Sequence, residues 1–254
     1  MDLNLRGKRV VVTGSGSGIG KVTALAFAQE GARVCLIGRR EAKLEETFNQ
    51  LEEVDGGHRY DSVDLFDAHA VCDFVARLQE EWGGCDILVN NACSLATLKR
   101  VHEMDAEHWD SFVSGNLRGL FLLCRGFLPA MKIGGWGRIV NVGSLTSELG
   151  SSHYAEYATV KAGMVGLTRN LAVDYSRYGV TVNAIQPGFI ATERFETAAP
   201  AKLIETFKNA TSVKRIGTPQ EVSDLILFLA SDRSSYITGA VIPIGGGAGL
   251  NNLW

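Results

Sequence analysis

The stretch "VVVTGSGSGIGK" at residues 10–21 decides the fold, because a β-branched run turns directly into a glycine-rich segment. Gly14, Gly16, Gly18 and Gly20 separate this run from a segment with helical periodicity. Glycine lets a backbone approach a ligand and take positive φ, and the first turn of a helix offers unpaired N–H groups to a phosphate. The spacing is a variant of the G-x-G-x-x-G fingerprint. It predicts a strand, a turn and a helix that bind a pyrophosphate, the alternative being a tight connection alone.

The same alternation of strand and helix continues along the chain. The apolar runs are nearly continuous in Val, Ile and Leu, which is typical of strands covered on both faces in a parallel sheet. We therefore predict an α/β fold, a single-domain doubly wound Rossmann-type parallel sheet flanked by helices on both faces. The predicted strands are 8–14, 32–38, 86–92, 137–144, 180–188 and 240–246, with a weaker one at 58–63, and the predicted helices are 18–30, 41–53, 67–82, 105–131, 155–178 and 219–231.

One segment, 189–216, interrupts this alternation. The chain has 254 residues with 46% hydrophobic content, which suffices for one sizeable core, so we expect one dinucleotide-binding catalytic domain over 1–254. The segment 189–216 is polar and follows a predicted strand. Because α/β proteins bind ligands at the carboxyl ends of their strands, we expect it to be a substrate lid, with a static surface excursion as the alternative.

Charge and cysteine usage exclude several classes of partner. With 25 basic and 28 acidic residues, the net charge of -3 gives no electrostatic case for nucleic acid or an anionic membrane. We therefore expect a small-molecule partner. No secretory leader is visible, and no apolar run reaches the roughly 18 residues of a membrane span. Five scattered cysteines disfavour both a disulfide framework and a zinc site, so a cytoplasmic protein without a metal is expected.

The end of the second predicted strand indicates which dinucleotide is bound. It reads "LIGRR" at 36–40, with Arg39 where a carboxylate would accept a hydrogen bond from the ribose 2′-hydroxyl of NAD(H). Arginine can instead pair with the 2′-phosphate of NADP(H). We therefore favour NADP(H) and keep NAD(H) possible, the alternative role of Arg39 and Arg40 being solvent-facing charges at a helix start.

A second stretch, "SSHYAEYATVK" at 151–161, carries a candidate acid–base pair. A phenol with a pKa near 10 needs a neighbour that favours its ionised form before it can work at neutral pH. Residues four apart share one face of a helix, so Lys161 can serve Tyr157. Tyr154 has Ala158 at that spacing and is expected to line the pocket or to pack.

These pieces have company along the chain. The turn "TGSGSGIG", the strand end "NNAC", Asn116 in "GNLRG", Ser144 in "NVGS", "YATVK" and "QPG" follow one another in an order that closely resembles the classical short-chain dehydrogenase/reductase family. The resemblance covers nearly the whole chain, through "RIGTPQEV" at 215–222 and "ITGAVIPIGGG" at 237–247. Each piece alone is weak, whereas six in the family's order are specific.

The resemblance implies a catalytic tetrad of Asn116, Ser144, Tyr157 and Lys161. Tyr157 would be the general acid in reduction and the base in oxidation. Ser144 would hold the substrate oxygen by a hydrogen bond. Lys161 would lower the tyrosine pKa and hold the nicotinamide ribose, and Asn116 would position a water.

The resemblance also implies the remaining site residues. Asp64 would lie near the adenine ring, Asn90 would stabilise the central sheet and border the cofactor, and residues 187–192 would contact the nicotinamide end. The expected cofactor-binding residues are Thr13, Gly14, Ser15, Ser17, Gly18, Ile19, Gly20, Arg39, Asp64, Leu65, Asn90, Ala92, Tyr157, Lys161, Pro187, Gly188, Ile190 and Thr192, and the expected substrate pocket is Ser94, Leu145, Leu149, Tyr154, Phe189, Arg194 and Phe195.

Two positions depart from the family's pattern. Cys93 stands where the family usually has glycine, and its thiol could narrow the pocket, be open to oxidation or simply pack. Gly245 replaces an acidic residue that the family commonly carries before its last double glycine. We expect this second change to leave catalysis intact, because the carboxylate is not part of the proton pathway.

The predicted function is an NADP(H)-dependent oxidoreductase that transfers hydride between nicotinamide and a ketone or secondary alcohol. The alternatives are an NAD(H)-dependent alcohol or polyol dehydrogenase, a 3-oxoacyl-[acyl-carrier-protein] reductase and, more remotely, a non-catalytic nucleotide-binding sensor. An acidic carrier would want a basic surface near the site. The helices at 105–131 and 155–178 are apolar on more than one face, so a homo-oligomer, dimer or tetramer, is expected. The basic side chains available to a carrier are Lys132, Arg138, Arg169 and Arg177.

Overall fold

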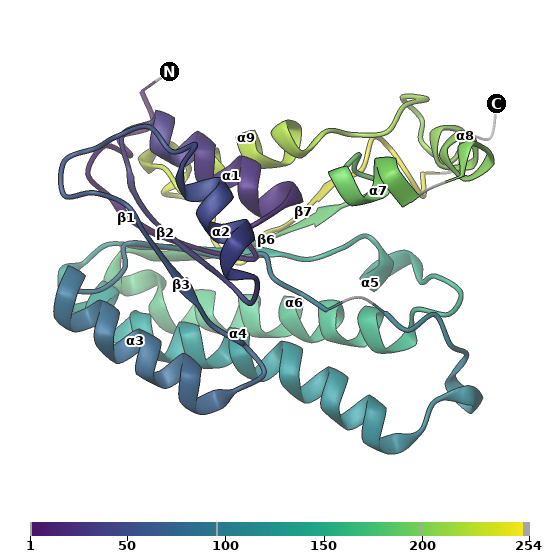
Figure 1. Cartoon of the computed structure of the whole chain (residues 1–254), viewed down its shortest axis with the longest axis horizontal. Helices are drawn as coiled ribbons and strands as arrows, with labels where there is room; N and C mark the ends of the chain where they lie inside the picture. Colours follow the sequence, from purple (N-terminus) through teal and green to yellow (C-terminus); the bar gives the residue numbers. More distant parts are fainter. Residues whose placement is uncertain (1, 95, 199, 251–254) are drawn as a thin grey trace.

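A seven-stranded sheet forms the centre of the computed structural model, which describes residues 2–94, 96–198 and 200–250 (Figure 1). Every strand pairs in parallel with its neighbours, in the order β3-β2-β1-β4-β5-β6-β7. The order reverses between β1 and β4, and open α/β sheets bind ligands at such a switch point. The predicted fold class is confirmed. The strands are β1 (Arg9–Thr13), β2 (Arg33–Gly38), β3 (Arg59–Ser62), β4 (Ile87–Asn90), β5 (Gly137–Val142), β6 (Val180–Pro187) and β7 (Val241–Ile244).

Helices cover both faces of the sheet (Figure 1). α1 and α9 pack together on one face, with α2 beside them, and α3, α4 and α6 pack in a row on the other. Within the described ranges, no helix combines the length and apolar character that crossing a bilayer requires. The helices are α1 (Gly18–Gln29), α2 (Glu41–Phe48), α3 (Ala68–Trp82), α4 (Ala106–Gly134), α5 (Thr146–Leu149), α6 (Ala155–Tyr175), α7 (Glu193–Ala198), α8 (Ala201–Ala210) and α9 (Pro219–Leu229), with 3₁₀ turns at Val101–Glu103, Ser176–Tyr178 and Asp232–Ser234.

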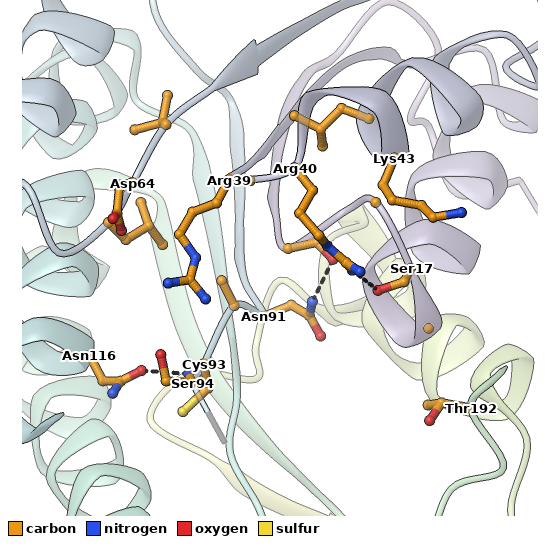
Figure 2. A pocket seen from close by; sticks show the side chains of 18 of the residues that line it. Ser17, Arg39, Arg40, Lys43, Asp64, Asn91, Cys93, Ser94, Asn116 and Thr192 are labelled. Atoms are coloured by element: carbon orange, nitrogen blue, oxygen red, sulfur yellow. Dashed lines mark hydrogen bonds between the residues drawn. The ribbon is translucent and has the colours of Figure 1, made fainter. Parts of the chain in front are cut away.

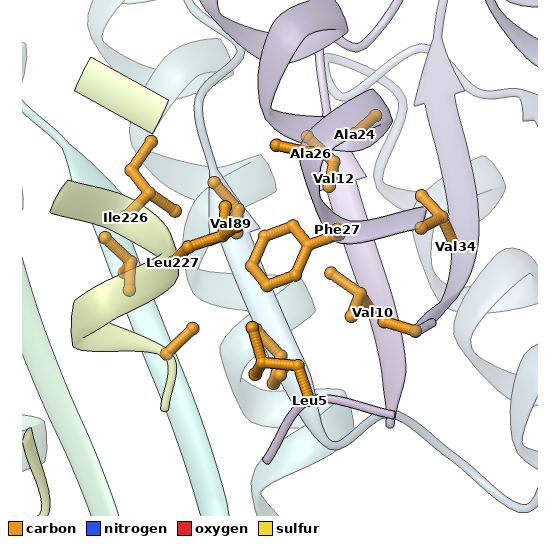
Figure 3. Packing of buried hydrophobic residues seen from close by; sticks show 14 of the residues in the cluster. Leu5, Val10, Val12, Ala24, Ala26, Phe27, Val34, Val89, Ile226 and Leu227 are labelled. Carbon is orange, nitrogen blue, oxygen red and sulfur yellow. The ribbon is translucent and has the colours of Figure 1, made fainter. Parts of the chain in front are cut away.

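The core consists of two clusters, one on each face of the sheet. Val10 and Val12 of β1 pack with Phe27 of α1 in one cluster (Figure 3). Val11 between them belongs to the other cluster, with Phe74 of α3. Successive residues of a strand point to opposite faces, so burying both faces requires the continuous apolar run that the sequence shows.

Three predicted helices end three or more residues away from their predicted ends. The predicted helix 41–53 ends at Phe48, because the next N–H groups bond three residues back in a tighter turn, from Gln50 to Thr47 and from Leu51 to Phe48. α6 gives way at Ser176 to a 3₁₀ turn that ends at Gly179, with φ +76°. α4 runs three residues past its predicted end to Gly134, where Gly135 with φ +67° terminates it.

The predicted interruption at 189–216 contains two helices, α7 and α8, that the sequence analysis did not predict. Its two ends meet, since Gly217 donates its N–H to the carbonyl of Phe189, and Ala191 donates to the carbonyl of Gly217. α8 has no buried residue. We call this segment the excursion, because it leaves β6 and returns beside it with little core of its own. Its expected role as a substrate lid stays a prediction.

Candidate active site

A cavity of about 1130 Å³ opens at the carboxyl ends of the first strands, at the switch point of the sheet (Figure 2). Its walls come from the glycine turn, the end of β2, the loops after β3 and β4, α4 and α7. The lining residues are Gly14, Gly16, Ser17, Gly18, Gly38, Arg39, Arg40, Lys43, Leu44, Val63, Asp64, Leu65, Phe66, Asn91, Ala92, Cys93, Ser94, Asn116, Thr192, Glu193 and Thr197.

The glycine turn leaves no room for a side chain at Gly20. A Cβ on Gly20 would lie 2.4 Å from the carbonyl oxygen of Gly14, far inside van der Waals contact. Gly14 itself has φ +67°. Asn91 fastens the turn to the end of β4, because its Nδ2 donates to Thr13 O at 2.9 Å and to Gly14 O at 3.4 Å. A backbone held this close to the cavity is what a bound pyrophosphate requires.

Cationic side chains gather at the end of β2. Arg40 donates from Nη2 to Ser17 Oγ at 3.1 Å, and Lys43 pairs with Glu46 at 2.6 Å. Figure 2 shows the Arg39 guanidinium extending into the cavity toward Asp64 and Asn91. None of its side-chain nitrogens hydrogen-bonds to a residue that the structure describes. Sequence analysis assigned only Arg39 to the site, although Lys43 stands one helical turn further on.

The proposed acid–base pair lies on α6, beside the end of β5. Lys161 is 2% exposed and donates from Nζ to the carbonyl of Val142 at 2.7 Å. The same Nζ is 5.5 Å from the centroid of the Tyr157 ring, as the spacing of four predicts. Ser144 donates its hydroxyl to Thr146 Oγ1 at 3.0 Å and accepts the N–H of Thr146 at 3.2 Å.

Burial has the largest effect on the pKa values of Tyr157 and the nearby Cys93. It raises the pKa of Tyr157 above its ordinary value, although the Lys161 ammonium and the Ser144 hydroxyl act to lower it. Burial likewise raises the pKa of the Cys93 thiol against the effect of Lys161. The lysine thus acts in the predicted direction, but without a cofactor the net shift of Tyr157 is upward. Both Tyr157 and Cys93 therefore keep their protons at neutral pH.

The amide of Asn116 joins two walls of the cavity. Its Oδ1 accepts the N–H of Ser94 at 2.8 Å (Figure 2). Its Nδ2 donates to the carbonyl of Phe112 one turn earlier on α4, also at 2.8 Å. Asn116 thus holds the loop after β4 against α4. Its expected role in positioning a water remains a prediction.

Several predicted cofactor residues lie behind the cavity wall. Thr13 Oγ1 accepts the N–H groups of Asn91 and Ala92, both at 2.8 Å, and Ser15 Oγ donates to the carbonyl of Ile37. Asn90 donates to Asn141 Oδ1 at 2.9 Å and so links β4 to β5. The others absent from the cavity's lining are Ile19, Gly20, Tyr157, Lys161, Pro187, Gly188 and Ile190.

The Gly245 departure has a steric reason. A Cβ on Gly245 would lie 2.3 Å from Leu145 Cδ1, and a Cβ on Gly188 would lie 2.8 Å from the Cα of Gly245. Leu145, a predicted pocket residue, therefore fills the space in which an acidic side chain at position 245 would begin. The turn at 245–247 packs directly on the end of β6.

The other predicted pocket residues are spread over several helices and loops. Tyr154 packs edge-on against Tyr157, with ring centroids 6.0 Å apart. Phe189 stacks on Phe207 of α8 at 3.9 Å, and Phe195 of α7 stacks on the same ring at 5.7 Å. Ser94 lines the large cavity, Leu149 is exposed, and the side chain of Arg194 lies outside the described part of the chain.

A second cavity, of about 160 Å³, lies at the base of the excursion and includes Phe189 and Ile190 in its walls. Sequence analysis missed several residues around both cavities. Asn91 stood in the quoted "NNAC" motif, whereas Phe66 of the large cavity and Thr211 of the small one carried no sequence signal. In the ranges that the structure describes, no three His, Cys, Asp or Glu side chains gather as a metal site would require.

Comparison with known proteins agrees with this arrangement. Residues 14–249 match the family described as enoyl-(acyl carrier protein) reductase. The chain is 37% identical to 3-oxoacyl-[acyl-carrier-protein] reductase FabG of Thermotoga maritima, over 96% of this chain and 99% of that protein. It is 36% identical to levodione reductase of Leifsonia aquatica, over 94% and 92% respectively.

A solved structure is similar over its whole length. L-sorbose reductase from Gluconobacter frateurii, complexed with NADPH and L-sorbose, superposes with a TM-score of 0.91 at 29% identity, covering 99% of this chain and 100% of that one. The matched family and these relatives, on a sheet of this topology, show that the chain belongs to the classical short-chain dehydrogenase/reductase family of NAD(P)-dependent enzymes acting on CH–OH and C=O groups.

Proposed function

We propose that the protein is an NADP(H)-dependent oxidoreductase acting on a ketone or its secondary alcohol, with Asn116, Ser144, Tyr157 and Lys161 as its catalytic residues. The observation that carries the proposal is the Tyr157–Lys161 pair: a protonated phenol stands beside a buried ammonium, at the end of β5. A protein freed from catalysis has no chemical need for that combination.

The cavity fits a phosphorylated dinucleotide. The glycine turn, in which even one added carbon would collide, leaves backbone close to the ligand's path. At the far end Arg39, Arg40 and Lys43 present three cations to the cavity, and arginine pairs well with phosphate. Asp64 and Thr192 also line the cavity, as the resemblance implies. L-sorbose reductase, which shares the fold, was solved with NADPH.

When bound, NADP(H) supplies or accepts a hydride at its nicotinamide ring. Tyr157 holds the proton that the reduced carbonyl oxygen requires, because burial favours the neutral phenol. Lys161, held by Val142 O, stabilises the tyrosinate left after that proton is donated. In oxidation the same groups run in reverse, with Tyr157 as the base.

Ser144 contributes a hydrogen bond to the substrate oxygen. Its hydroxyl donates to Thr146 Oγ1, and rotation about the Cβ–Oγ bond would turn that donor toward a bound substrate. Ser144 Oγ also accepts the N–H of Thr146, and this bond holds the oxygen in place whichever way the hydroxyl hydrogen points. Ser144 is therefore positioned before the substrate arrives.

Reduction of a 3-oxoacyl thioester on a carrier protein is the second candidate, because FabG enzymes are among the relatives. The basic side chains considered for such a carrier lie elsewhere. Lys132 and Arg177 both stack on the ring of Tyr178, at 4.5 and 4.9 Å, just before β6 begins. Arg138 at the start of β5 is buried near Asp232. These three side chains lie at the amino ends of strands, opposite the cavity, so they form no basic surface beside it.

The outer faces of α4 and α6 support a homo-oligomer. Phe121 is 48% exposed and Val173 is 78% exposed. Large exposed apolar side chains of this kind are often covered by a partner chain. We propose a dimer or tetramer, which light scattering would refute by returning the 27.4 kDa mass of one chain. The five cysteines are free thiols, which supports a cytoplasmic location.

A turnover panel tests the function. Nicotinamide absorbance is followed with free ketones, keto-sugars and 3-oxoacyl thioesters, with NADPH and NADH in parallel. We expect turnover of free ketones or keto-sugars, faster with NADPH. A preference for thioesters would establish the second candidate, and tight NADPH binding without turnover of any class would favour a nucleotide sensor.

A further inference from the structure

Glu156, one residue before Tyr157, has a fully buried side chain. Carboxylates are almost never fully buried unless they are paired. Its Oε1 accepts the N–H of Thr97 at 2.7 Å and the Thr97 hydroxyl at 2.9 Å, and it lies 3.5 Å from His108 Nε2. Oε2 has no hydrogen-bond partner among the described residues. A buried carboxylate bonded in this way holds its donor residue, here Thr97, in place.

The electrostatics of Glu156 agree with a permanent negative charge. Burial acts to raise its pKa, but the two hydrogen bonds from Thr97 and the nearby His108 hold the pKa below its ordinary value. Glu156 also lies in the first turn of α6, where the helix dipole favours an anion. The carboxylate is therefore ionised across the neutral range.

The group that Glu156 holds is the loop after β4. This loop, residues 91–94 and 96–100, has no regular secondary structure, and Cys93 and Ser94 within it line the large cavity. It is attached to helices at two points, Ser94 to Asn116 of α4 and Thr97 to Glu156 of α6. Beyond Thr97 the loop is exposed.

We propose that Glu156 is a positioning residue that fastens the loop after β4 to α6 through Thr97 and thereby sets the affinity for the carbonyl substrate. The inference rests on the proposed function. Without the attachment, the cavity wall at Cys93 and Ser94 would move, and substrate binding would have to order it again. Glu156 supplies no proton, because the proton pathway runs through Tyr157 and Lys161.

The first test needs no turnover. Lys99 and Arg100 are exposed trypsin sites just beyond Thr97. We expect Glu156→Ala to be cut there about fivefold faster or more, since the opening of a loop controls its cleavage. Glu156→Gln keeps an acceptor oxygen and should be cut near the wild-type rate. Asp174→Ala, an exposed carboxylate on the same helix, is the matched control. Equal cutting of Glu156→Ala and Asp174→Ala would overturn the proposal.

The second test separates positioning from chemistry. We expect Glu156→Ala to raise KM for the ketone about tenfold while kcat stays within about threefold and the NADPH dissociation constant within about twofold. A fall in kcat with KM unchanged would overturn the proposal. Because trypsin reports on the loop directly, an enzyme inactive on every ketone would count against the proposed function alone.

A milder pair of variants covers the case in which Glu156→Ala does not fold. Thr97→Val removes one of the two donors to Glu156 and leaves the backbone bond, while Thr97→Ser restores the hydroxyl. We expect Thr97→Val to shift cleavage and KM in the same direction by a smaller factor, and Thr97→Ser to reverse both. Failure of Thr97→Val to change either would contradict the inference.

Discussion

The glycine turn and the excursion at 189–216 both border ligand-binding space, but they are built in opposite ways. In the turn, Gly20 packs so closely on Gly14 that one carbon would not fit, and Asn91 binds the turn to β4. In the excursion, α8 buries no residue and is held by the stacked rings of Phe207 and its neighbours. The turn is fixed by close contact between backbones, whereas the excursion is fixed by backbone hydrogen bonds at its two ends and by a few side chains between them.

Proteins similar to nearly the whole chain include 3-oxoacyl-[acyl-carrier-protein] reductase FabG, levodione reductase and L-sorbose reductase, whose names indicate different substrates. In this chain, a turn closed by backbone contact tolerates little change in side-chain size. α8 contributes no buried residue, so its side chains can change without disturbing the sheet, and we expect substrate choice to depend on this segment more than on the turn.

The largest expected effect lies in the fixed region. Gly20→Ala places a carbon 2.4 Å from Gly14 O. We expect the free energy of unfolding to fall by about 2–4 kcal/mol and NADPH binding to be lost as well. Urea unfolding and a NADPH titration measure both. Gly166→Ala, in α6, is the control, because an added Cβ there would meet nothing within 4 Å. Alanine in this helix should raise the free energy of unfolding by about 0.5–1 kcal/mol. A Gly20→Ala protein as stable as the wild type would break the comparison.

A smaller effect should fall on one cofactor only. Arg39→Ala removes a guanidinium that faces the cavity, and we expect NADPH binding to weaken about tenfold or more while NADH binding stays within about twofold. Titrations with both cofactors measure the ratio. Arg6→Ala, an exposed arginine ahead of β1, should change neither. Equal losses for the two cofactors would mean that Arg39 does not recognise the 2′-phosphate.

The smallest effect belongs to the excursion. Phe207→Ala removes the ring between Phe189 and Phe195, and we expect about 1 kcal/mol less stability, since aromatic pairs contribute about that much. KM for the ketone should rise a few-fold, and NADPH binding should not change. Leu203→Ala, a half-exposed position on α8, is the control. Weaker NADPH binding in Phe207→Ala would show that the two regions are coupled.

Local patterns predicted the elements whose burial is continuous. Apolar runs such as Val10 to Val12 pack on both faces of the sheet, so their composition alone predicted the strands. The Tyr157–Lys161 pair was readable because helical spacing alone places the two side chains together.

Features made by distant contacts were not readable. α8 carries apolar residues such as Leu203 and Phe207, but the ring on which it packs, Phe189, lies well before it in the sequence, just after β6. The contact between Thr97 and Glu156 joins residues 59 apart, and neither residue type predicts the other. The upward pKa shift of Tyr157 reflects its burial by the whole fold, which no spacing of four can indicate.

The central claim is that Tyr157 donates the proton in the reaction and that NADPH binding does not depend on its hydroxyl. Steady-state turnover and NADPH titration of Tyr157→Phe, on the best ketone of the panel, test this most directly. We expect turnover to fall at least about a hundredfold, with the NADPH dissociation constant within a few-fold of the wild type. Activity retained above about one per cent would contradict the assignment of Tyr157 as the proton donor.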